Sequence, residues 1–417
     1  MNTSLLQQVI LFHPTGNQFV RALLAALFEH GLLAEFFTTI TPPASIIPFI
    51  PASIKEKLNR RSFPIPSARI TRFPLRETLR LVAGAVGFSR IIEPETGFAC
   101  FDQVAQSFDR LVSKKIRDNW AGKIAWVYGY EDSALQTFHE ARKLNIQCAY
   151  DLPIAYWKTS RALLEEECSR YPAWKDTMRG AFDSQKKCER KDGELDLADL
   201  IICPSIFVLE TLPENVRKTK PCIVVPFGSP ENIFQKRNPY SNNFHEPLRV
   251  LFAGTMTQRK GLADVFQAMK LLKRKDVSLT VIGTPCAPLE FYYHQYPDFH
   301  FEPSRPHNQV LQLMSSHDVF LLPSIVEGRA LVQQEAMMQG LPVVATVNAG
   351  ASDIIENEKT GFIVPIRHPE IIAKKLDWMA DHREKVKEMG FAAHLAASRL
   401  TWSIYAKKII ATLKTSI

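Results

Sequence analysis

Hydrophobic residues in this chain gather in short runs, which are separated by segments with a helical spacing of apolar positions. This alternation favours parallel sheets whose strands are connected by helices. The first unit consists of an expected strand at residues 8–13, a helix at 17–30 and a second strand at 34–40. Residues 41–100 are rich in proline, and we interpret them as an insertion rather than as a regular strand–helix unit.

The alternation returns near residue 124 and predicts two series of elements, separated by the polar, turn-rich residues 228–247. We therefore expect an N-terminal domain at 1–228, a C-terminal domain at 229–395 and a closing helix at 396–417 that returns to the N-terminal domain. Two doubly wound domains that face each other form a cleft at the carboxyl ends of their strands. The first series has expected strands at 124–130, 146–152, 200–204 and 222–227, a helix at 134–144 and a long helical stretch before 200; the second has strands at 248–253, 278–282, 319–322, 342–346 and 361–364, with helices at 260–273, 307–316 and 330–339.

Composition is that of an ordinary globular protein, because 46% of the residues are hydrophobic and 23% are charged. No run approaches the ~18 apolar residues of a membrane-spanning helix, and residues 1–8 carry no basic residue, so we expect no secretory signal peptide. The cysteines are scattered without a CxxC pair, which favours reduced thiols in the cytoplasm over disulfides or a zinc site. They are Cys100, Cys148, Cys168, Cys188, Cys203, Cys222 and Cys286.

The chain has a formal net charge of +8, and residues 51–90 hold nine basic residues against two acidic ones. This segment is either a solvated basic face or a surface that contacts an anionic membrane. Interleaved apolar residues are typical of the second interpretation. We expect no nucleic-acid partner, since no binding motif accompanies the charges. The basic residues are Lys55, Lys57, Arg60, Arg61, Arg69, Arg72, Arg76, Arg80 and Arg90, and the apolar ones are Phe63, Phe73, Leu75 and Leu79.

The most informative segment is residues 323–344, PSIVEGRALVQQEAMMQGLPVV. Glu327 and Gly328 follow an expected strand and precede a helix that stops at Gly340. The free N–H groups at the start of such a helix form an anion site. Glu335 lies at most about 12 Å beyond Glu327 along a helix. One carboxylate can therefore bind a sugar and the other a ribose, with a diphosphate between them.

This segment resembles the Glu-x7-Glu motif of the retaining, GT-B-fold glycosyltransferases of family 4. The resemblance extends over nearly the whole chain: residues 24–39 resemble the family's first helix and second strand, 198–205 its AD-x-x-x-x-S segment, and 225–228 the entry to its linker. Thr401-Trp402 resembles the start of its closing helix. The resemblance implies an α/β protein of GT-B fold, with two facing Rossmann-like domains. It also implies retaining transfer of a sugar from a nucleotide-sugar donor to a glycan, lipid-linked or small-molecule acceptor.

By this resemblance, Glu327 contacts the transferred sugar as a catalytic residue, and Glu335 binds the ribose hydroxyls. The alternatives are an acid favoured by the helix dipole for Glu327 and a surface helix carboxylate for Glu335. Gly328, Arg329, Ala330 and Leu331 are assigned to the donor site because they stand at the start of the helix.

A second segment places Lys260 at the start of a helix, shortly after an expected strand that ends at Gly254. Cations at a helix start oppose its dipole, so a bound anion is their natural counterpart. The resemblance implies that this loop, with Lys260, holds the donor diphosphate. Many family members have Arg where this chain has Thr255, and we assign that role to Arg259; the alternative is a pair of solvated basic residues. Gly283, after the next strand, is also assigned to the donor site.

The N-terminal domain is expected to supply the acceptor site and part of the donor-sugar environment. His13 and Gly16 follow the first strand, where the family has a glycine-rich loop; His13 either faces the cleft or simply ends the strand. Asp151 ends another strand near a position where family members often have His. It either accepts a hydrogen bond from a substrate hydroxyl or caps a turn. We assign His13 and Asp151 to the catalytic set and Gly16 to the donor site.

Further residues leave alternatives open. Arg329 stands where the family often has the Phe of Gly-Phe-Gly, and it can pair with Glu327, contact phosphate or select an acidic or unusual sugar. Trp157, Tyr171 and Trp174 either flank an acceptor or pack in a core.

The chain has no DxD motif suited to a metal-bound diphosphate and no His/Cys cluster. We therefore expect no metal and no cofactor, with the leaving diphosphate stabilised by cationic side chains and helix amides. The expected protein is a cytoplasmic hexosyltransferase-type enzyme of polysaccharide or glycoconjugate biosynthesis, with possible peripheral membrane contact. Two alternatives are a GT-B-fold nucleotide-sugar epimerase, which needs no acceptor, and a degenerate transferase that acts as a binding partner and has lost donor residues.

Overall fold

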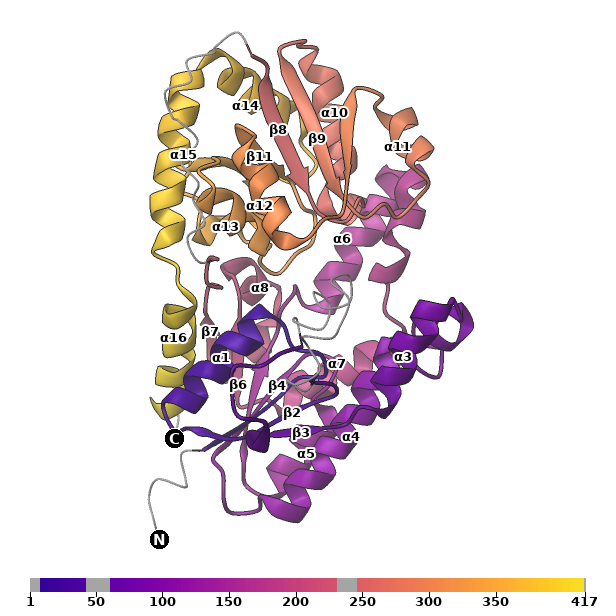
Figure 1. Ribbon diagram of the computed structural model, residues 1–417, viewed down its shortest axis with the longest axis vertical. Helices are drawn as coiled ribbons and strands as arrows, with labels where there is room; N and C mark the ends of the chain where they lie inside the picture. The colour runs from indigo at the N-terminus through magenta and orange to yellow at the C-terminus, as the bar shows by residue number, and fades with distance from the viewer. Residues whose placement is uncertain (1–7, 43–60, 231–245, 416–417) are drawn as a thin grey trace.

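The computed structural model describes residues 8–42, 61–230 and 246–415. Figure 1 shows two lobes, each built on its own sheet, with the C-terminal lobe above the N-terminal one. Most of the expected boundary segment, together with Lys55, Lys57 and Arg60 of the basic segment, lies outside the described residues.

The N-terminal sheet is parallel and has the order β3-β2-β1-β4-β5-β6-β7. The first strand lies inside the sheet, so the strand order reverses beside it, as in doubly wound folds. The strands are β1 (Val9–Phe12), β2 (Leu33–Thr38), β3 (Ile70–Arg72), β4 (Trp126–Tyr130), β5 (Gln147–Asp151), β6 (Leu200–Cys203) and β7 (Cys222–Val224).

Helices cover this sheet, and the first shows how the sequence sets their limits. The Asn17 side chain accepts a hydrogen bond from the Val20 amide and caps the start of α1. After the helix, Gly31 adopts a positive φ of 67°, which favours glycine. The helices are α1 (Gln18–Glu29), α3 (Leu75–Val86), α4 (Phe101–Asn119), α5 (Leu135–Lys143), α6 (Trp157–Arg170), α7 (Gln185–Leu197), α8 (Ile206–Thr211) and α9 (Glu214–Thr219), with 3₁₀ turns η3 (Ser67–Arg69), η4 (Ser89–Ile92) and η5 (Pro172–Ala181).

The C-terminal sheet is also parallel, with the order β10-β9-β8-β11-β12-β13. Its strands are β8 (Leu248–Ala253), β9 (Val277–Gly283), β10 (Phe299–Pro303), β11 (Val319–Leu322), β12 (Val343–Thr346) and β13 (Gly361–Val364). Its helices are α10 (Leu262–Leu272), α11 (Leu289–Gln295), α12 (His307–Ser315), α13 (Leu331–Met338), α14 (Pro369–Asp381) and α15 (Arg383–Ser398), with 3₁₀ turns η6 (Gln258–Lys260), η7 (Val347–Ala349) and η8 (Ala351–Asp353).

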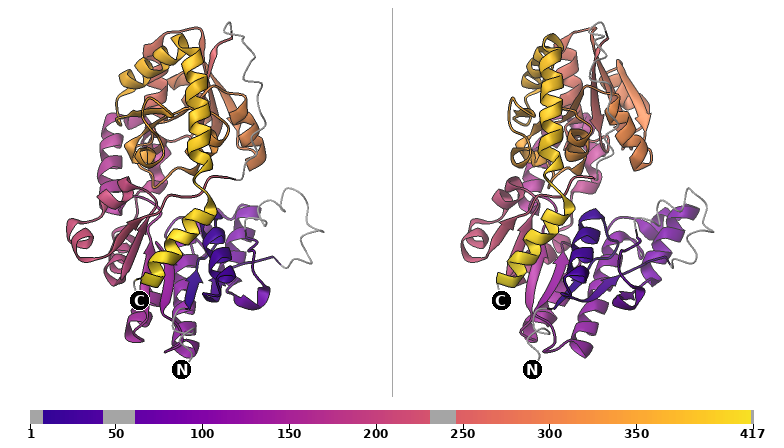
Figure 2. Two further views of the ribbon diagram at one scale, coloured as in Figure 1. Left: turned by 90° about the vertical axis from the view of Figure 1, so that its left-hand side faces the viewer. Right: turned by 60° about the vertical axis from the view of Figure 1, so that its left-hand side comes forward.

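The last helix, α16 (Trp402–Thr415), leaves the C-terminal lobe and packs against α1 of the N-terminal lobe, as Figure 2 shows. The Trp126 indole N–H donates to the Leu413 carbonyl at 3.1 Å and ties this helix to the N-terminal sheet. Gly228 lies against the start of α16, where a Cβ would stand 2.4 Å from the Trp402 amide nitrogen. The two lobes are therefore connected by the last helix as well as by the chain between the sheets.

A second connection is made by α6 and η5, which extend from the N-terminal lobe onto the C-terminal one (Figure 1). Trp174 of η5 is buried in the C-terminal core among Phe266 and Tyr292. The Tyr171 hydroxyl donates to Asp264 at 2.8 Å. Tyr171 and Trp174 thus pack in and against a core, whereas Trp157 at the start of α6 lies on a cavity.

Each strand expected from the sequence is present in the structure, but the strands β3 and β10 and the helices α3, α4, α8, α9 and α11 were not expected. Residues 41–100 were expected to be an insertion, but β3 extends the sheet beside β2 and α3 follows it, so that interpretation was wrong for this part. β3 has only three residues, and β10 mixes His and Glu with its phenylalanines, so neither forms an apolar run. The long helical stretch before β6 is divided into α6 and α7 by η5, where Pro172 follows the end of α6.

In the described part of the chain, no helix is long and apolar enough to cross a membrane.

Candidate functional site

A cavity of about 590 Å³ lies at the carboxyl ends of the C-terminal strands. Its floor consists of the residues that follow β8 and β9, together with the start of α13, and the N-terminal lobe closes it with Phe19, Pro153 and Phe227. Ligands in doubly wound sheets bind at this edge. Of the predicted site residues it brings together Gly254, Thr255, Arg259, Lys260, Gly283, Glu327, Arg329, Ala330, Leu331 and Glu335.

Glu327 is held between two cations at the centre of this cavity. Its Oε1 lies 2.6 Å from Lys260 Nζ and 2.5 Å from Arg259 Nη1. Arg259 Nη1 also donates to the Val326 carbonyl at 3.0 Å. Burial alone would raise the pKa of the Glu327 carboxyl, but Lys260 and Arg259 hold it below its usual value. Glu327 is therefore a carboxylate at neutral pH, and the triad carries a net positive charge that an anion can neutralise.

Burial lowers the pKa of the Lys260 ammonium, and Arg259 adds to this effect, while Glu327 opposes it. Lys260 lies on η6, which its neighbour Gly261 ends at φ 77°. A Cβ on Gly261 would stand 2.1 Å from the Pro323 carbonyl oxygen, so this glycine permits the close approach of two loops. The loop after β8 thus lies directly against the loop that carries Glu327.

Helix α13 begins at the cavity without a side-chain cap. Its first two residues, Leu331 and Val332, line the cavity, and the first N–H groups of a helix have no acceptor within it. They offer an anion the hydrogen bonds and the positive end of the helix dipole. One turn on, Glu335 Oε1 is 2.9 Å from the His307 ring, which orients the carboxylate.

Arg329 does not contact Glu327. Its Nη2 donates to Asp353 at 2.6 Å and its Nε donates to the Pro204 carbonyl at 2.6 Å. Ser205 donates to the Gly328 carbonyl at 2.6 Å, so this loop is fastened to the N-terminal lobe. Of the interpretations left open for Arg329, pairing with Glu327 is wrong, and its contacts are those of a link between the two lobes.

Gly328 also serves the contact between the lobes, because a Cβ there would stand 1.7 Å from the Pro153 carbonyl oxygen. Gly328 is not among the residues that line the cavity, so its predicted part in the donor site is limited to its position just before α13.

The N-terminal residues of the predicted set are not brought to this cavity. His13 is half-buried and its Nδ1 accepts from the Gly16 amide at 2.7 Å, so it shapes the turn after β1. Burial, reinforced by Arg61, lowers the pKa of His13 to about 3, which keeps the ring neutral. The turn also explains Gly16, which has φ 73° and packs against Phe63.

Asp151 is buried in the N-terminal lobe and accepts a hydrogen bond from the Tyr128 hydroxyl at 2.7 Å. Burial raises the pKa of this carboxyl to about 7, although the Tyr128 and Tyr405 hydroxyls oppose the shift. We expected Asp151 and His13 to face the substrates, and the geometry does not support that expectation. Each lies at or just after the end of a strand and forms its hydrogen bonds within the N-terminal lobe.

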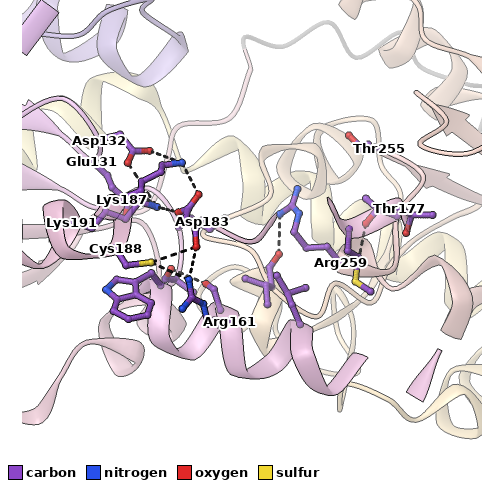
Figure 3. Close-up of a pocket in the computed structure, with 18 of the residues that line it drawn as sticks. Glu131, Asp132, Arg161, Thr177, Asp183, Lys187, Cys188, Lys191, Thr255 and Arg259 are labelled. Atoms are coloured by element: carbon purple, nitrogen blue, oxygen red, sulfur yellow. Dashed lines mark hydrogen bonds and ion pairs between the residues drawn. The ribbon is translucent and has the colours of Figure 1, made fainter. Parts of the chain in front are cut away.

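A second cavity, of about 470 Å³, lies between α6, α7 and the loop after β8 (Figure 3). Arg259 and Thr255 line both this cavity and the first one, so the two cavities adjoin. Figure 3 shows Arg259 on one side and a cluster of charged side chains on the other, with Arg161 near that cluster. Trp157 also lines this cavity.

The charged cluster is internally paired. Asp183 lies 2.6 Å from Lys187 Nζ and 2.7 Å from Lys191 Nζ, and Glu131 lies 3.4 Å from Lys191 Nζ. Burial raises the pKa of the Glu131 carboxyl to about 7, against the pull of Lys191. The sequence patterns did not single out Lys187 and Lys191 as residues of a site. Their spacing of four residues on α7 was the only available signal.

No group of His, Cys, Asp and Glu side chains in the described residues is arranged to hold a metal ion. All cysteines of the chain lie in the described residues, and each is a free thiol.

Residues 233–395 match the family model described as glycosyl transferases group 1. The putative colanic acid biosynthesis glycosyltransferase WcaL of Escherichia coli (strain K12) is 29% identical over 143 residues, which are 31% of this chain and 35% of the relative. The D-inositol 3-phosphate glycosyltransferase of Corynebacterium diphtheriae is 26% identical over 263 residues, or 57% of this chain and 61% of that relative. The matches thus span about a third of the first relative and less than two thirds of the second.

Solved structures match over almost the whole chain. Sucrose-phosphate synthase of Thermosynechococcus elongatus has a TM-score of 0.67 at 17% identity and covers 98% of this chain and 99% of that chain. HepE of Anabaena, solved with UDP-glucose, has a TM-score of 0.62 at 14% identity, with 98% and 100% covered. At such identities the likeness concerns the fold alone. The chain therefore has the GT-B fold of these structures, and its residues 233–395 match the family model of the glycosyl transferases of group 1.

Proposed function

We propose that the chain is a retaining glycosyltransferase of family 4 that takes a sugar from a nucleotide-sugar donor. The observation that carries this proposal is the triad of Glu327, Lys260 and Arg259 at the uncapped start of α13, with Glu335 one turn further on. This arrangement combines an anion site with two carboxylates suited to hydroxyl groups. The match of residues 233–395 to the family model of group 1 glycosyl transferases supports the assignment.

In the proposed mechanism, the donor diphosphate binds Lys260, Arg259 and the first amides of α13. When the bond between the anomeric carbon and the diphosphate oxygen breaks, the electron pair leaves with that oxygen, and these fixed cations and dipoles stabilise the new charge. Glu327 then stabilises the positive charge that develops at the anomeric carbon. Retention requires the acceptor oxygen to form its bond to the anomeric carbon on the face from which the diphosphate departs, and the acceptor's hydroxyl proton passes to the departing diphosphate oxygen.

Glu335 is proposed to bind the ribose hydroxyls, as the His307 contact leaves its second carboxylate oxygen for a ligand. We propose that the reaction needs no metal, because Lys260 and Arg259 supply the positive charge that a divalent ion would otherwise provide. The complex of HepE with UDP-glucose makes uridine nucleotides the first donors to test.

The second cavity is the proposed acceptor site. It adjoins the donor cavity at Arg259, and its volume of about 470 Å³ is sufficient for one or two sugar rings. Its lysines are paired with carboxylates, so it offers hydrogen-bond donors and acceptors with little net charge. Trp157 offers an aromatic face. These features favour an uncharged, hydroxyl-rich acceptor, such as the end of a glycan.

The test is turnover of a panel of UDP-, GDP- and ADP-sugars, with and without EDTA, in the presence of a panel of sugar acceptors. The expected result is transfer from one donor, insensitive to EDTA, to give a product with the donor's anomeric configuration. Conversion of the donor to another nucleotide sugar without acceptor would instead identify an epimerase, and activity lost in EDTA and restored by magnesium would contradict metal independence.

A further inference from the structure

The helix α3 has its charged side buried and its apolar side exposed. Its buried residues are Glu77 and Ala83. Leu75, Val82 and Val86 are 85%, 53% and 60% exposed, and Leu79 is also exposed. These four positions recur at intervals of three or four residues, so they form one continuous stripe along the helix. A soluble helix normally turns such a stripe toward the core.

The orientation of α3 is fixed by an ion-pair cluster around Glu77. Glu77 is fully buried and pairs with Arg61 and, at 2.7 Å, with Arg80 Nε. A buried carboxylate with two guanidinium partners is costly to remove from them. Rotating the helix to bury its apolar stripe would break these pairs, so the exposed stripe is a property of the folded protein.

The apolar surface continues beyond the helix. Phe88 is 64% exposed after the end of α3, and Phe98 is 62% exposed on the following loop. The Arg76 guanidinium lies over the Phe98 ring, 4.5 Å from its centre, and places positive charge beside it. We call the set of Leu75, Leu79, Val82, Val86, Phe88 and Phe98 the α3 apolar face. A contiguous exposed patch of this kind marks an interaction surface.

Arginines border the α3 apolar face. Arg72 precedes α3 and Arg90 follows it, and both are exposed. Within residues 61–230, neither forms an ion pair with a carboxylate, and Glu93 is an exposed acid on the same stretch. Figure 1 shows α3 at the outer edge of the N-terminal lobe, across that lobe from α16. The surface therefore combines an apolar stripe with flanking positive charge at an edge of the molecule.

We propose that the α3 apolar face, with Arg72, Arg76 and Arg90, docks on an anionic lipid surface. An amphipathic helix with arginines beside its apolar stripe lies in the membrane interface, with the apolar residues among the acyl chains and the guanidinium groups at the headgroups. The charge complementarity is what favours lipid over a second copy of this chain, because two such faces would bring their arginines together. The inference does not depend on the donor chemistry.

The test is flotation with vesicles of phosphatidylcholine alone and of phosphatidylcholine with about one third phosphatidylglycerol. Wild-type protein is expected to float with the anionic vesicles at low salt and to lose most binding at ~1 M salt, where screening acts within about 3 Å. The double variant Leu75→Ser/Val86→Ser should bind at least about tenfold more weakly than the wild type, because it removes two side chains from the interface. Arg72→Gln/Arg90→Gln should reduce binding by about fivefold for each arginine.

The matched control is Phe391→Ser/Ile404→Ser, which removes two apolar side chains that are also more than half exposed, from α15 and α16. It should float like the wild type, and thermal melts should show all variants folded. Equal binding by the Leu75→Ser/Val86→Ser variant and the control would overturn the proposal. So would failure of the wild type to float together with self-association abolished by the α3 variant, which would assign the face to a second copy. A wild-type protein that floats normally but transfers no sugar would count against the proposed function and not against the membrane proposal.

Discussion

The two walls of the cleft differ in how their chemistry is assembled. The C-terminal wall takes its site residues from a few short segments, each at the carboxyl end of a strand, and leaves Lys260 and Arg259 sharing one carboxylate. On the N-terminal wall, Asp183 and Asp132 each pair with both Lys187 and Lys191, and Glu131 also pairs with Lys191. The first wall has a net positive charge that an anion can neutralise, whereas on the second wall the positive charges are matched by carboxylates. Under the proposed function, the donor is therefore recognised by charge on one side of the cleft, and the acceptor by shape and hydrogen bonding on the other.

The largest expected effect is on the C-terminal wall. Glu327→Gln should lower kcat by about a hundred-fold, on the scale of lost electrostatic stabilisation in a transition state. Nucleoside diphosphate should bind this variant at least as tightly as the wild type, because Lys260 and Arg259 lose their internal partner. Steady-state kinetics and equilibrium binding on the same preparation measure both. A normal kcat would remove Glu327 from the chemistry.

The same contrast explains what the sequence could predict. Glu327, Glu335 and Lys260 lie in contiguous patterns whose spacing already fixes their geometry on a loop and a helix. The N-terminal residues have no such pattern. Whether Asp151 faces a substrate or Tyr128 depends on packing between strands and α16, which are far apart in sequence. Arg329 was ambiguous for the same reason, since its partner Asp353 is supplied by a separate turn.

The second prediction concerns the diphosphate. Lys260→Ala should weaken nucleoside diphosphate binding by about tenfold or more, because a charged hydrogen bond is worth roughly 1.5–3 kcal/mol. Thr255→Ala is the control on the same loop and should have a smaller effect, as it removes no charge. Calorimetric titration compares them. Equal, small losses would mean that the diphosphate does not bind this loop.

The third prediction separates ribose binding from chemistry. Glu335→Ala should raise the donor KM by about tenfold with a smaller effect on kcat, because its contact exists already in the bound ground state. His307→Ala, which removes the ring in contact with Glu335 but keeps the carboxylate, should raise KM less. If Glu335→Ala lowers kcat and leaves KM unchanged, the assignment to the ribose is wrong.

The fourth prediction tests the N-terminal wall. Trp157→Ala should raise the acceptor KM by about fivefold, on the scale of one lost aromatic contact. Hydrolysis of the donor without acceptor should keep its wild-type rate, since Trp157 does not line the donor cavity. A variant in which both rates fall together would show that the two cavities do not have separate roles.

The smallest effect is on stability. Burial raises the pKa of both Glu131 and Asp151 to about 7, whereas in the unfolded chain such groups titrate near 4. The folded state thus holds protons that the unfolded state has lost, so the free energy of unfolding should fall as pH rises from about 4 to 7. Glu131→Gln and Asp151→Asn should each flatten this fall, and chemical denaturation at several pH values measures it. Unchanged slopes in both variants would contradict the raised pKa values.

The central claim is that the triad and the start of α13 hold the donor diphosphate, with one glutamate for the sugar and the other for the ribose. Its most direct test is calorimetric titration of the wild type, Glu327→Gln, Glu335→Ala and Lys260→Ala with the diphosphate of the preferred donor. We predict that the wild type and Glu327→Gln bind tightly, because the diphosphate lacks the sugar, and that Glu335→Ala and Lys260→Ala bind at least several-fold more weakly. Loss of binding in Glu327→Gln alone, with the other two variants unaffected, would contradict the account.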